Sequence, residues 1–293
     1  MADRAPRAAA ALLLGVVVAG AGRAAAAPAP AFHRKAALSH VRVLSHDIGV
    51  RVRGTTHELR AARYVAGTLA DLGYRVRIQR FRVDGGRSRN VVAWWPGADA
   101  LGIVLGGHID TVRGSPGAND NASGVAVILE LARLLAGTGQ AGFLRFVAFG
   151  SEEYSSSGVH HVGSQTFVDR LGRRGRRRLA GMASIDMIAD GRPLIAGTAG
   201  IGPPLLARVL VRTISRAGIR VRYRVTCDCS DNGPFERAGI PSAFMWSGDE
   251  TDYHSPSDTI RNLSPRDLDR TGEAMLAFAW RVDRALIRRL RSA

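Results

Sequence analysis

The chain has 293 residues, of which 46% are hydrophobic, which is ample for a folded core. Its formal net charge of +16 is carried almost entirely by arginine, because Lys35 is the single lysine. The densest basic run, residues 173–178, has no interleaved aromatic residues and no nucleic-acid fold signature. We therefore expect an exposed surface loop there and no nucleic-acid partner.

The first 27 residues have the three parts of a secretory signal peptide. Arg4 and Arg7 precede an apolar run from Ala8 to Ala19, and small residues follow as far as Ala27. The run is too short for a comfortable membrane span. We expect cleavage after Ala27, a secreted protein, and no stable membrane insertion after cleavage. An uncleaved N-terminal anchor is the alternative.

Downstream, hydrophobic periodicity predicts helices that alternate with strands. Helices are predicted over residues 57–73, 124–137, 204–217 and 265–286, with Ser123 as a possible cap of the second. Strands are predicted over residues 74–83, 90–95, 101–106, 144–149, 182–188, 221–225 and 242–246. No linker-like stretch interrupts this pattern. It predicts a single α/β domain over residues 28–293, with a twisted, mixed, mostly parallel sheet flanked by helices on both faces.

Metal-ligand residue types stand at or near the ends of several of these strands. His108 follows one apolar run, Glu152 and Glu153 follow the next, and Asp186 lies in a third. Ligands of such sheets bind beyond the carboxyl ends of the strands. Side chains that are far apart in the sequence can therefore converge on one site.

Two further candidates are Asp120 in PGANDNASG and His254 in DYHSPSDT. Taken singly, such residues are usually turn residues, helix caps or exposed loop residues. As a set, two histidines and three carboxylates suffice for two adjacent divalent metals if one carboxylate serves both. Neutral imidazole and carboxylate suit zinc. A metal pair that shares a carboxylate indicates a hydrolase that activates water.

At these segments the chain resembles the M28 peptidases, the co-catalytic zinc aminopeptidase family. The resemblance runs from about Gly54 to Leu263. Its landmarks are GGHIDTV, PGANDNASGVAVILELAR, FVAFGSEE, SIDMI, SDNGPFERAGIP and YHSPSDT. Any one of these motifs would be weak evidence, but their order and spacing together are specific. The resemblance implies two zinc ions, one held by His108 and Asp186, the other by Glu153 and His254, with Asp120 bridging them.

The resemblance also implies roles for residues beside the ligands. Glu152 is the catalytic general acid and base, and Asp110 holds the imidazole of His108. Tyr253 matches a tyrosine that assists the transition state in some members. The peptide bond after Asp120 is cis in structures of the family, so we expect the same of the bond to Asn121.

The chain departs from the family pattern around the expected pocket rim. The loop YSSSGVHHV after the double glutamate is longer than in many members, and we interpret His160 and His161 as loop histidines. The arginine-rich run resembles an insertion. Cys227 and Cys229 either form a strained disulfide or remain free thiols.

The resulting hypothesis is a secreted aminopeptidase with two zinc ions, acting on peptide substrates. Alternatives on the same scaffold are a carboxypeptidase, a dipeptidase or a glutaminyl cyclase-like enzyme. The alternative from another class is a metal-free, inactive relative that serves as a binding module. The sequence leaves the oligomeric state open.

Overall fold

Apolar runs of the sequence form the centre of an eight-stranded sheet. The computed structural model describes residue 1 and residues 30–84, 86–98, 101–248 and 251–292. Residues 31–293 form one compact unit. The predicted leader, apart from Met1, lies outside the described residues, so both its cleavage and the domain boundary after Ala27 stay predictions. No helix among the described residues is both long enough and apolar enough to cross a bilayer.

Four strands that are buried or nearly so run parallel through the middle of the sheet. The strand order is β1-β2-β4-β3-β5-β8-β6-β7. Strands β4, β3, β5 and β8 are mutually parallel, whereas the β1–β2, β2–β4 and β6–β8 pairs are antiparallel. The strands are β1 (Arg75–Val83), β2 (Gly86–Trp94), β3 (Ile103–His108), β4 (Leu144–Phe149), β5 (Gly181–Ile185), β6 (Leu194–Thr198), β7 (Val221–Val225) and β8 (Ser242–Ser247). The carboxyl ends of β3, β4, β5 and β8 therefore meet at one edge.

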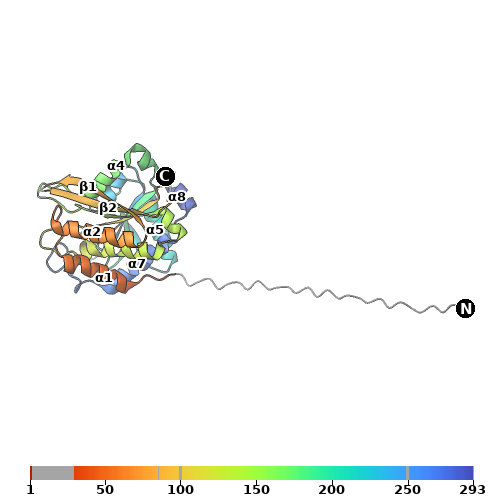
Figure 1. Ribbon diagram of the computed structural model, residues 1–293, viewed down its shortest axis with the longest axis horizontal. Helices are drawn as coiled ribbons and strands as arrows, with labels where there is room; N and C mark the ends of the chain where they lie inside the picture. Colours follow the sequence, from red (N-terminus) through yellow and green to blue (C-terminus); the bar gives the residue numbers. More distant parts are fainter. Residues whose placement is uncertain (2–29, 85, 99–100, 249–250, 293) are drawn as a thin grey trace. The chain divides into compact units, whose positions relative to one another are not determined.

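Helices cover both faces of the sheet, as the sequence predicts. Helices α1, α2, α3, α5 and α7 lie on one face and α4 and α6 on the other, with α4 across β1 and β2 from α2 (Figure 1). The α-helices are α1 (Arg34–Arg42), α2 (Thr56–Asp71), α3 (Gly124–Leu135), α4 (Val162–Arg178), α5 (Leu205–Arg216), α6 (Asn232–Arg237), α7 (Pro265–Ala279) and α8 (Arg284–Arg291). Shorter helical segments are η1 (Val43–Ile48), η2 (Ala118–Ser123) and η3 (Gly139–Phe143).

The arginine-rich run is helical, so the prediction of a loop is wrong. Residues 173–178 form the last turns of α4, and a non-helical residue, Gly172, interrupts the helix just before them. Arginine is a good helix former, which favours this outcome once the preceding turns exist. The side chains of Arg173, Arg174, Arg177 and Arg178 are exposed, as expected.

Two other local predictions are also wrong. Residues 265–286 form two helices, because Asp283 starts a new one by accepting a hydrogen bond from Leu286 N at 2.7 Å. Ser123 does not cap α3. Its hydroxyl donates to Asn119 O at 2.7 Å, and Asn121 Oδ1 accepts from the Gly124 N–H at 2.9 Å instead.

A fully buried arginine ties the amino-terminal segment to the loop before α3. The guanidinium of Arg51 donates to the carbonyls of Leu44, Ile109, Pro116 and Gly117 at 2.7–2.9 Å, and to a fifth carbonyl at 3.0 Å. Burial lowers the pKa of Arg51 to about 10, although nearby carboxylates oppose the shift. Arg51 therefore remains charged at neutral pH and satisfies carbonyls that would otherwise be buried without donors.

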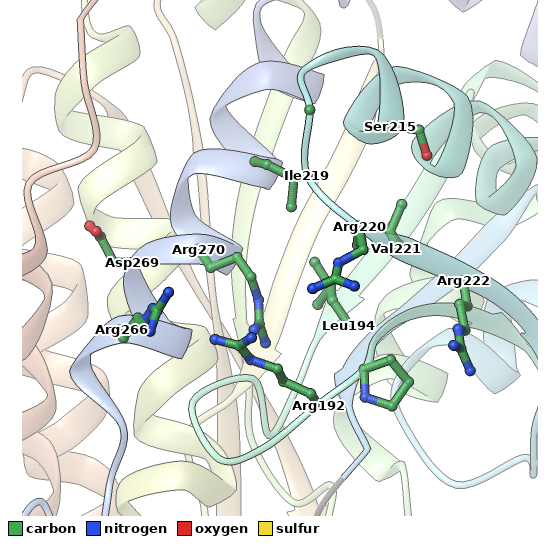
Figure 2. A pocket seen from close by; sticks show the side chains of 12 residues that line it. Arg192, Leu194, Ser215, Ile219, Arg220, Val221, Arg222, Arg266, Asp269 and Arg270 are labelled. Atoms are coloured by element: carbon green, nitrogen blue, oxygen red, sulfur yellow. The ribbon is translucent and has the colours of Figure 1, made fainter.

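A second arginine-rich feature lies along the edge formed by β6 and β7. A cavity of about 960 Å³ is bounded by the start of these strands, the end of α5 and the start of α7 (Figure 2). It shares no described lining residue with the cavity that contains the metal-ligand types.

Replacing Arg51 by methionine should lower the free energy of unfolding by about 3–5 kcal/mol, because the carbonyls lose a charged donor in a buried site. Urea denaturation followed by circular dichroism measures the change. Arg63→Met, at an exposed position of α2, is the matched control and should shift stability by no more than about 0.5 kcal/mol. Equal stability of the two variants would show that the Arg51 hydrogen bonds contribute nothing.

Candidate metal centre

The parallel strands place the predicted ligands at their carboxyl ends. His108 is the last residue of β3, and Asp186 follows β5 directly. Glu152 and Glu153 follow β4 after a two-residue turn. All four side chains are less than 10% exposed. The expectation that these strand ends converge is confirmed.

Asp120 lies in η2, where the chain turns into α3. The Asp120–Asn121 peptide bond is cis, as the resemblance implied. Asp258 accepts hydrogen bonds from Asn119 N at 2.6 Å and from Asp120 N at 3.0 Å. The side-chain amide of Asn121 donates to Ile185 O at 2.9 Å. These contacts fix the backbone on both sides of the Asp120 carboxylate.

The two oxygens of Asp120 face two different histidines. His108 Nε2 lies 3.0 Å from Asp120 Oδ1 and 3.3 Å from Asp186 Oδ1. His254 Nε2 lies 3.3 Å from Asp120 Oδ2 and 3.0 Å from Glu153 Oε2. The five residues therefore form two groups that share Asp120, and in each group the potential ligand atoms lie within 4.8 Å of one another.

The surroundings of His108 leave its Nε2 lone pair for a cation. His108 Nδ1 lies 3.1 Å from Asp110 O, a carbonyl that can only accept, so a neutral ring carries its proton on Nδ1. The Nε2 lone pair then faces carboxylate oxygens, an arrangement that needs a positive charge between them. Burial lowers the pKa of His108, but Asp186 and Glu152 outweigh it and raise that pKa well above its ordinary value.

Two carboxylates of the site also have buried oxygens that lack a hydrogen-bond partner in the described part of the chain. Glu153 Oε1 and Asp186 Oδ1 are buried and accept no hydrogen bond from any described residue. Burial, followed by the charge of Asp120, raises the pKa of Glu153 to about 7. Buried carboxylate oxygens without donors, facing imidazole nitrogens that must otherwise be protonated, fit divalent cations of the zinc type.

Asp110 acts mainly on the backbone of the double glutamate. Its Oδ1 and Oδ2 accept from Glu152 N at 3.0 Å and Glu153 N at 3.2 Å, whereas Oδ1 is 3.7 Å from His108 Nδ1. The expectation that the Asp110 carboxylate holds the imidazole of His108 is therefore wrong: the main-chain carbonyl of Asp110 lies against His108 Nδ1 instead. The carboxylate of Asp110 accepts from the buried N–H groups of Glu152 and Glu153, which would otherwise lack acceptors.

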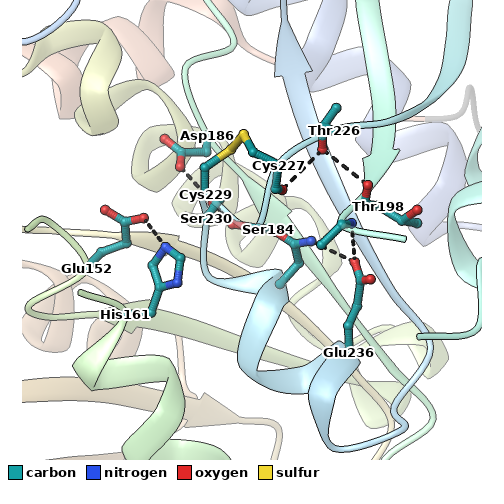
Figure 3. Close-up of a disulfide and its surroundings, with 12 residues drawn as sticks. Glu152, His161, Ser184, Asp186, Thr198, Thr226, Cys227, Cys229, Ser230 and Glu236 are labelled. Carbon is teal, nitrogen blue, oxygen red and sulfur yellow. Dashed lines mark hydrogen bonds and ion pairs between the residues drawn. A yellow bond between two sulfur atoms is a disulfide. The ribbon is translucent and has the colours of Figure 1, made fainter. Parts of the chain in front are cut away.

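His161 lies in the loop before α4, as interpreted, but it is a buried neighbour of Glu152 and not an exposed loop residue. It is 2% exposed, and its Nε2 lies 3.0 Å from Glu152 Oε1 (Figure 3). Burial, followed by His160, lowers the pKa of His161 to about 2, so the ring is neutral and can donate one hydrogen bond. The other oxygen of Glu152 lies 3.9 Å from His108 Nε2. Glu152 is therefore held between two imidazoles.

Sequence reasoning also missed the residues behind Asp186. Ser230 Oγ donates to Asp186 Oδ2 at 2.8 Å and lies 2.9 Å from Ser184 Oγ (Figure 3). Asp231 is fully buried beside them, and burial raises its pKa to about 7. The motif SDNGPFERAGIP was visible in the sequence, but only the fold brings its first residues behind β5.

A cavity of about 410 Å³ opens over both groups. Its other walls include Met187, Phe244 and Trp246, together with the disulfide between Cys227 and Cys229. Of the two alternatives left open for the cysteines, the structure thus has the bonded one. Tyr253 also lines the cavity, and its ring stacks on that of His254 at 3.7 Å between centroids.

A family model and related proteins show which family the chain belongs to. Residues 90–279 match the model of Peptidase family M28, which covers more than half of the chain. The chain belongs to peptidase family M28. It is 29% identical over 285 residues to leupeptin-inactivating enzyme 1 of Streptomyces exfoliatus, covering 87% of this chain and 64% of that protein. It is 31% identical over 188 residues to aminopeptidase YwaD of Bacillus subtilis, covering 61% of this chain and 40% of that protein.

The M28 chain thus spans less than two thirds of the length of either curated relative. Its fold matches the crystal structure of BSAP, a zinc aminopeptidase from Bacillus subtilis, with a TM-score of 0.78 and 21% identity. That match covers 85% of this chain and 95% of the other. The α/β sheet with its flanking helices is therefore the fold of zinc aminopeptidases.

Backbone conformation in this M28 domain is unusual where the site lies. Among the described residues other than glycine, positive φ values occur at Ser151, His161, Met187 and His254, between 51° and 58°. Each of them is a site residue or a direct sequence neighbour of one. Left-handed backbone costs energy in a residue with a side chain and persists where surrounding contacts enforce it.

Substituting Asp258 by asparagine should weaken zinc binding about 10–100-fold, because one of the two buried N–H groups of the loop that presents Asp120 then faces an NH2 group in place of an acceptor. Competition with a chromogenic chelator measures the zinc affinity. Asp71→Asn, at an exposed position at the end of α2, removes the same charge and should leave the affinity unchanged. Unaltered affinity in Asp258→Asn would contradict the supporting role of this carboxylate.

Proposed function

We propose that this chain is a zinc-dependent aminopeptidase that removes N-terminal residues from peptides with two zinc ions. The observation that carries the proposal is the shared carboxylate of Asp120, whose two oxygens each face one histidine. Membership of family M28 supports the same activity. The curated relatives bear names of an aminopeptidase and a leupeptin-inactivating enzyme, which also supports hydrolysis of peptides.

In this proposal each group of ligand types holds one zinc. His108 and Asp186 would hold the first, Glu153 and His254 would hold the second, and Asp120 would contribute one oxygen to each. Bound zinc would supply Lewis acidity, which makes water acidic enough to attack a peptide carbonyl at neutral pH.

Glu152 is the group that we assign to proton transfer. Burial raises its pKa well above the ordinary value; the charge of His108 opposes this shift and that of Glu153 adds to it. A carboxyl group with a raised pKa can take a proton from water and return it to the leaving amine near neutral pH. His161 holds one oxygen of Glu152, so the other oxygen can face the reacting water.

The remaining walls of the cavity would position the substrate. Met187, Phe244 and Trp246 offer apolar surface beside the ligand groups, which favours an apolar side chain at the substrate's first residue. The Tyr253 hydroxyl keeps its proton, because burial and the surrounding carboxylates raise its pKa. It can therefore donate a hydrogen bond to the carbonyl oxygen under attack.

Peptides with a free or an acetylated N-terminus distinguish the proposal from its rivals. The zinc-loaded protein should release the first residue only from the free peptide, and a chelator should abolish the reaction. Mass spectrometry of the products identifies the residue that is released. Release from the C-terminus would indicate a carboxypeptidase. Cyclisation of an N-terminal glutamine would indicate a glutaminyl cyclase-like enzyme, and an unchanged peptide would favour the metal-free binding module.

The variant Glu152→Gln should retain two equivalents of zinc and lose about 10²–10⁴-fold in kcat, because the proton-transfer group is removed.

The variant His161→Phe keeps the Glu152 carboxylate but removes its contact with the imidazole, and should lower kcat about tenfold with KM unchanged. Zinc content by mass spectrometry and steady-state rates on an aminoacyl anilide measure both. Full activity of Glu152→Gln at full zinc content would remove Glu152 from the mechanism.

We also propose that the mature protein is exported. The leader pattern up to Ala27 and the disulfide between Cys227 and Cys229 both support an oxidising destination. Expression of the full chain with a C-terminal tag should give extracellular protein whose first residue is Pro28. N-terminal sequencing tests this, and a tagged protein that stays in the cell with its leader intact would refute it.

A further inference from the structure

An arginine cluster lines the cavity between α5, α7 and the first residues of β6 and β7. The side chains of Arg192, Arg220 and Arg270 turn toward the same space (Figure 2). Arg222 and Arg266 also line this cavity. The acidic residue among the described lining residues is Asp269. Five guanidinium groups thus border one concavity that has far less negative charge.

The cluster is only partly neutralised by the protein. Asp267 Oδ1 lies 2.8 Å from Arg270 Nη1 and 3.5 Å from Arg192 Nε, so these two arginines share one carboxylate oxygen. Arg220 and Arg266 form no ion pair with any described residue. Arg270 Nε is buried and has no hydrogen-bond partner within the described part of the chain. A buried donor of this kind calls for an acceptor beyond the described residues, such as a water or a ligand oxygen.

The arginine charges also act on one another. Burial lowers the pKa of Arg270, Asp267 opposes the shift, and the charges of Arg192, Arg266 and Arg220 lower it further. Like charges held together in this way cost free energy unless a counter-charge binds among them.

We propose that this cavity binds a small ligand with two or more phosphate groups. Guanidinium groups recognise phosphate oxygens through paired hydrogen bonds, and each phosphate monoester carries close to two negative charges at neutral pH. Two such groups carry about three to four negative charges, enough to balance the five arginines after Asp267 and Asp269 are subtracted. The cavity volume of about 960 Å³ is that of a small-molecule site. Its concave form suits a compact ligand better than a flat membrane surface.

The test uses fructose 1,6-bisphosphate as the probe and the zinc-loaded full domain in isothermal titration calorimetry. Measurements at 0.15 M salt screen charges that lie further apart than about 8 Å. The unmodified protein should bind one equivalent of the bisphosphate. The variant Arg220→Gln/Arg266→Gln should bind it at least tenfold more weakly, and it should fold normally because both side chains are exposed and unpaired among the described residues.

The control variant is Arg173→Gln/Arg174→Gln, which removes the same two charges from an exposed part of α4. It should bind the bisphosphate as tightly as the unmodified protein. Equal loss of affinity in both variants would show attraction by net charge alone and overturn the proposal. So would equal affinity of all three proteins, since that places the ligand elsewhere, for example at zinc.

A hexaglutamate peptide distinguishes phosphate from an acidic protein segment. If the peptide binds with the same dependence on Arg220 and Arg266 and the bisphosphate does not bind, the cavity is a docking site for acidic peptides and the phosphate proposal is wrong. None of these readouts uses peptidase activity. The proposal therefore stands or falls separately from the enzymatic function.

Discussion

Concentrated negative charge in a buried place is the constraint on which the rest of this structure depends. Asp120, Glu152, Glu153, Asp186 and Asp231 are each less than 10% exposed and lie together at the ends of parallel strands. Water cannot stabilise these carboxylates there, so they need cations or protons. His108 and His254 direct their Nε2 atoms into the same space. Proteins tolerate such a concentration where it binds metal.

Buried hydrogen bonds hold the backbone on both sides of Asp120. The loop before α3 offers its N–H groups to Asp258 and its carbonyls to Arg51. One buried anion and one buried cation thus satisfy opposite sides of the same stretch of backbone. Asn121 then joins this loop to β5 through Ile185. The position of the shared carboxylate is set by hydrogen bonds from three distant parts of the chain.

Sequence patterns predicted those parts of the structure that depend on one segment at a time. The limits of β4 and β7 follow from their residue patterns, and the ligands at strand ends follow from the rule for parallel sheets. The short strand β6 was not predicted, because its five residues include Gly197 and lie in a region rich in turn residues. Its identity as a strand depends on pairing with β8 and β7, which local sequence does not encode.

Side-chain contacts across the site were harder to predict for a related reason. His161 points inward because its own backbone is left-handed, with a φ of 55°, and no sequence pattern marks that conformation in a histidine. Asp258 lies in a motif that was recognised for His254. Its contact with the Asp120 loop joins residues almost 140 positions apart. Such pairs become visible only when the fold is known.

The separation of the two neighbouring glutamates shows how the backbone divides their tasks. The Asp110 carboxylate accepts both of their N–H groups, so the two peptide units are fixed together just beyond β4. Strict alternation of side chains ends where the strand ends, and the carboxylates diverge. Glu153 reaches His254, and Glu152 reaches His161. Glu152 thus belongs to neither of the two groups of ligand residues that share Asp120. A proton carrier needs this freedom, because a bound cation stabilises the carboxylate anion, lowers its pKa and so weakens it as a base.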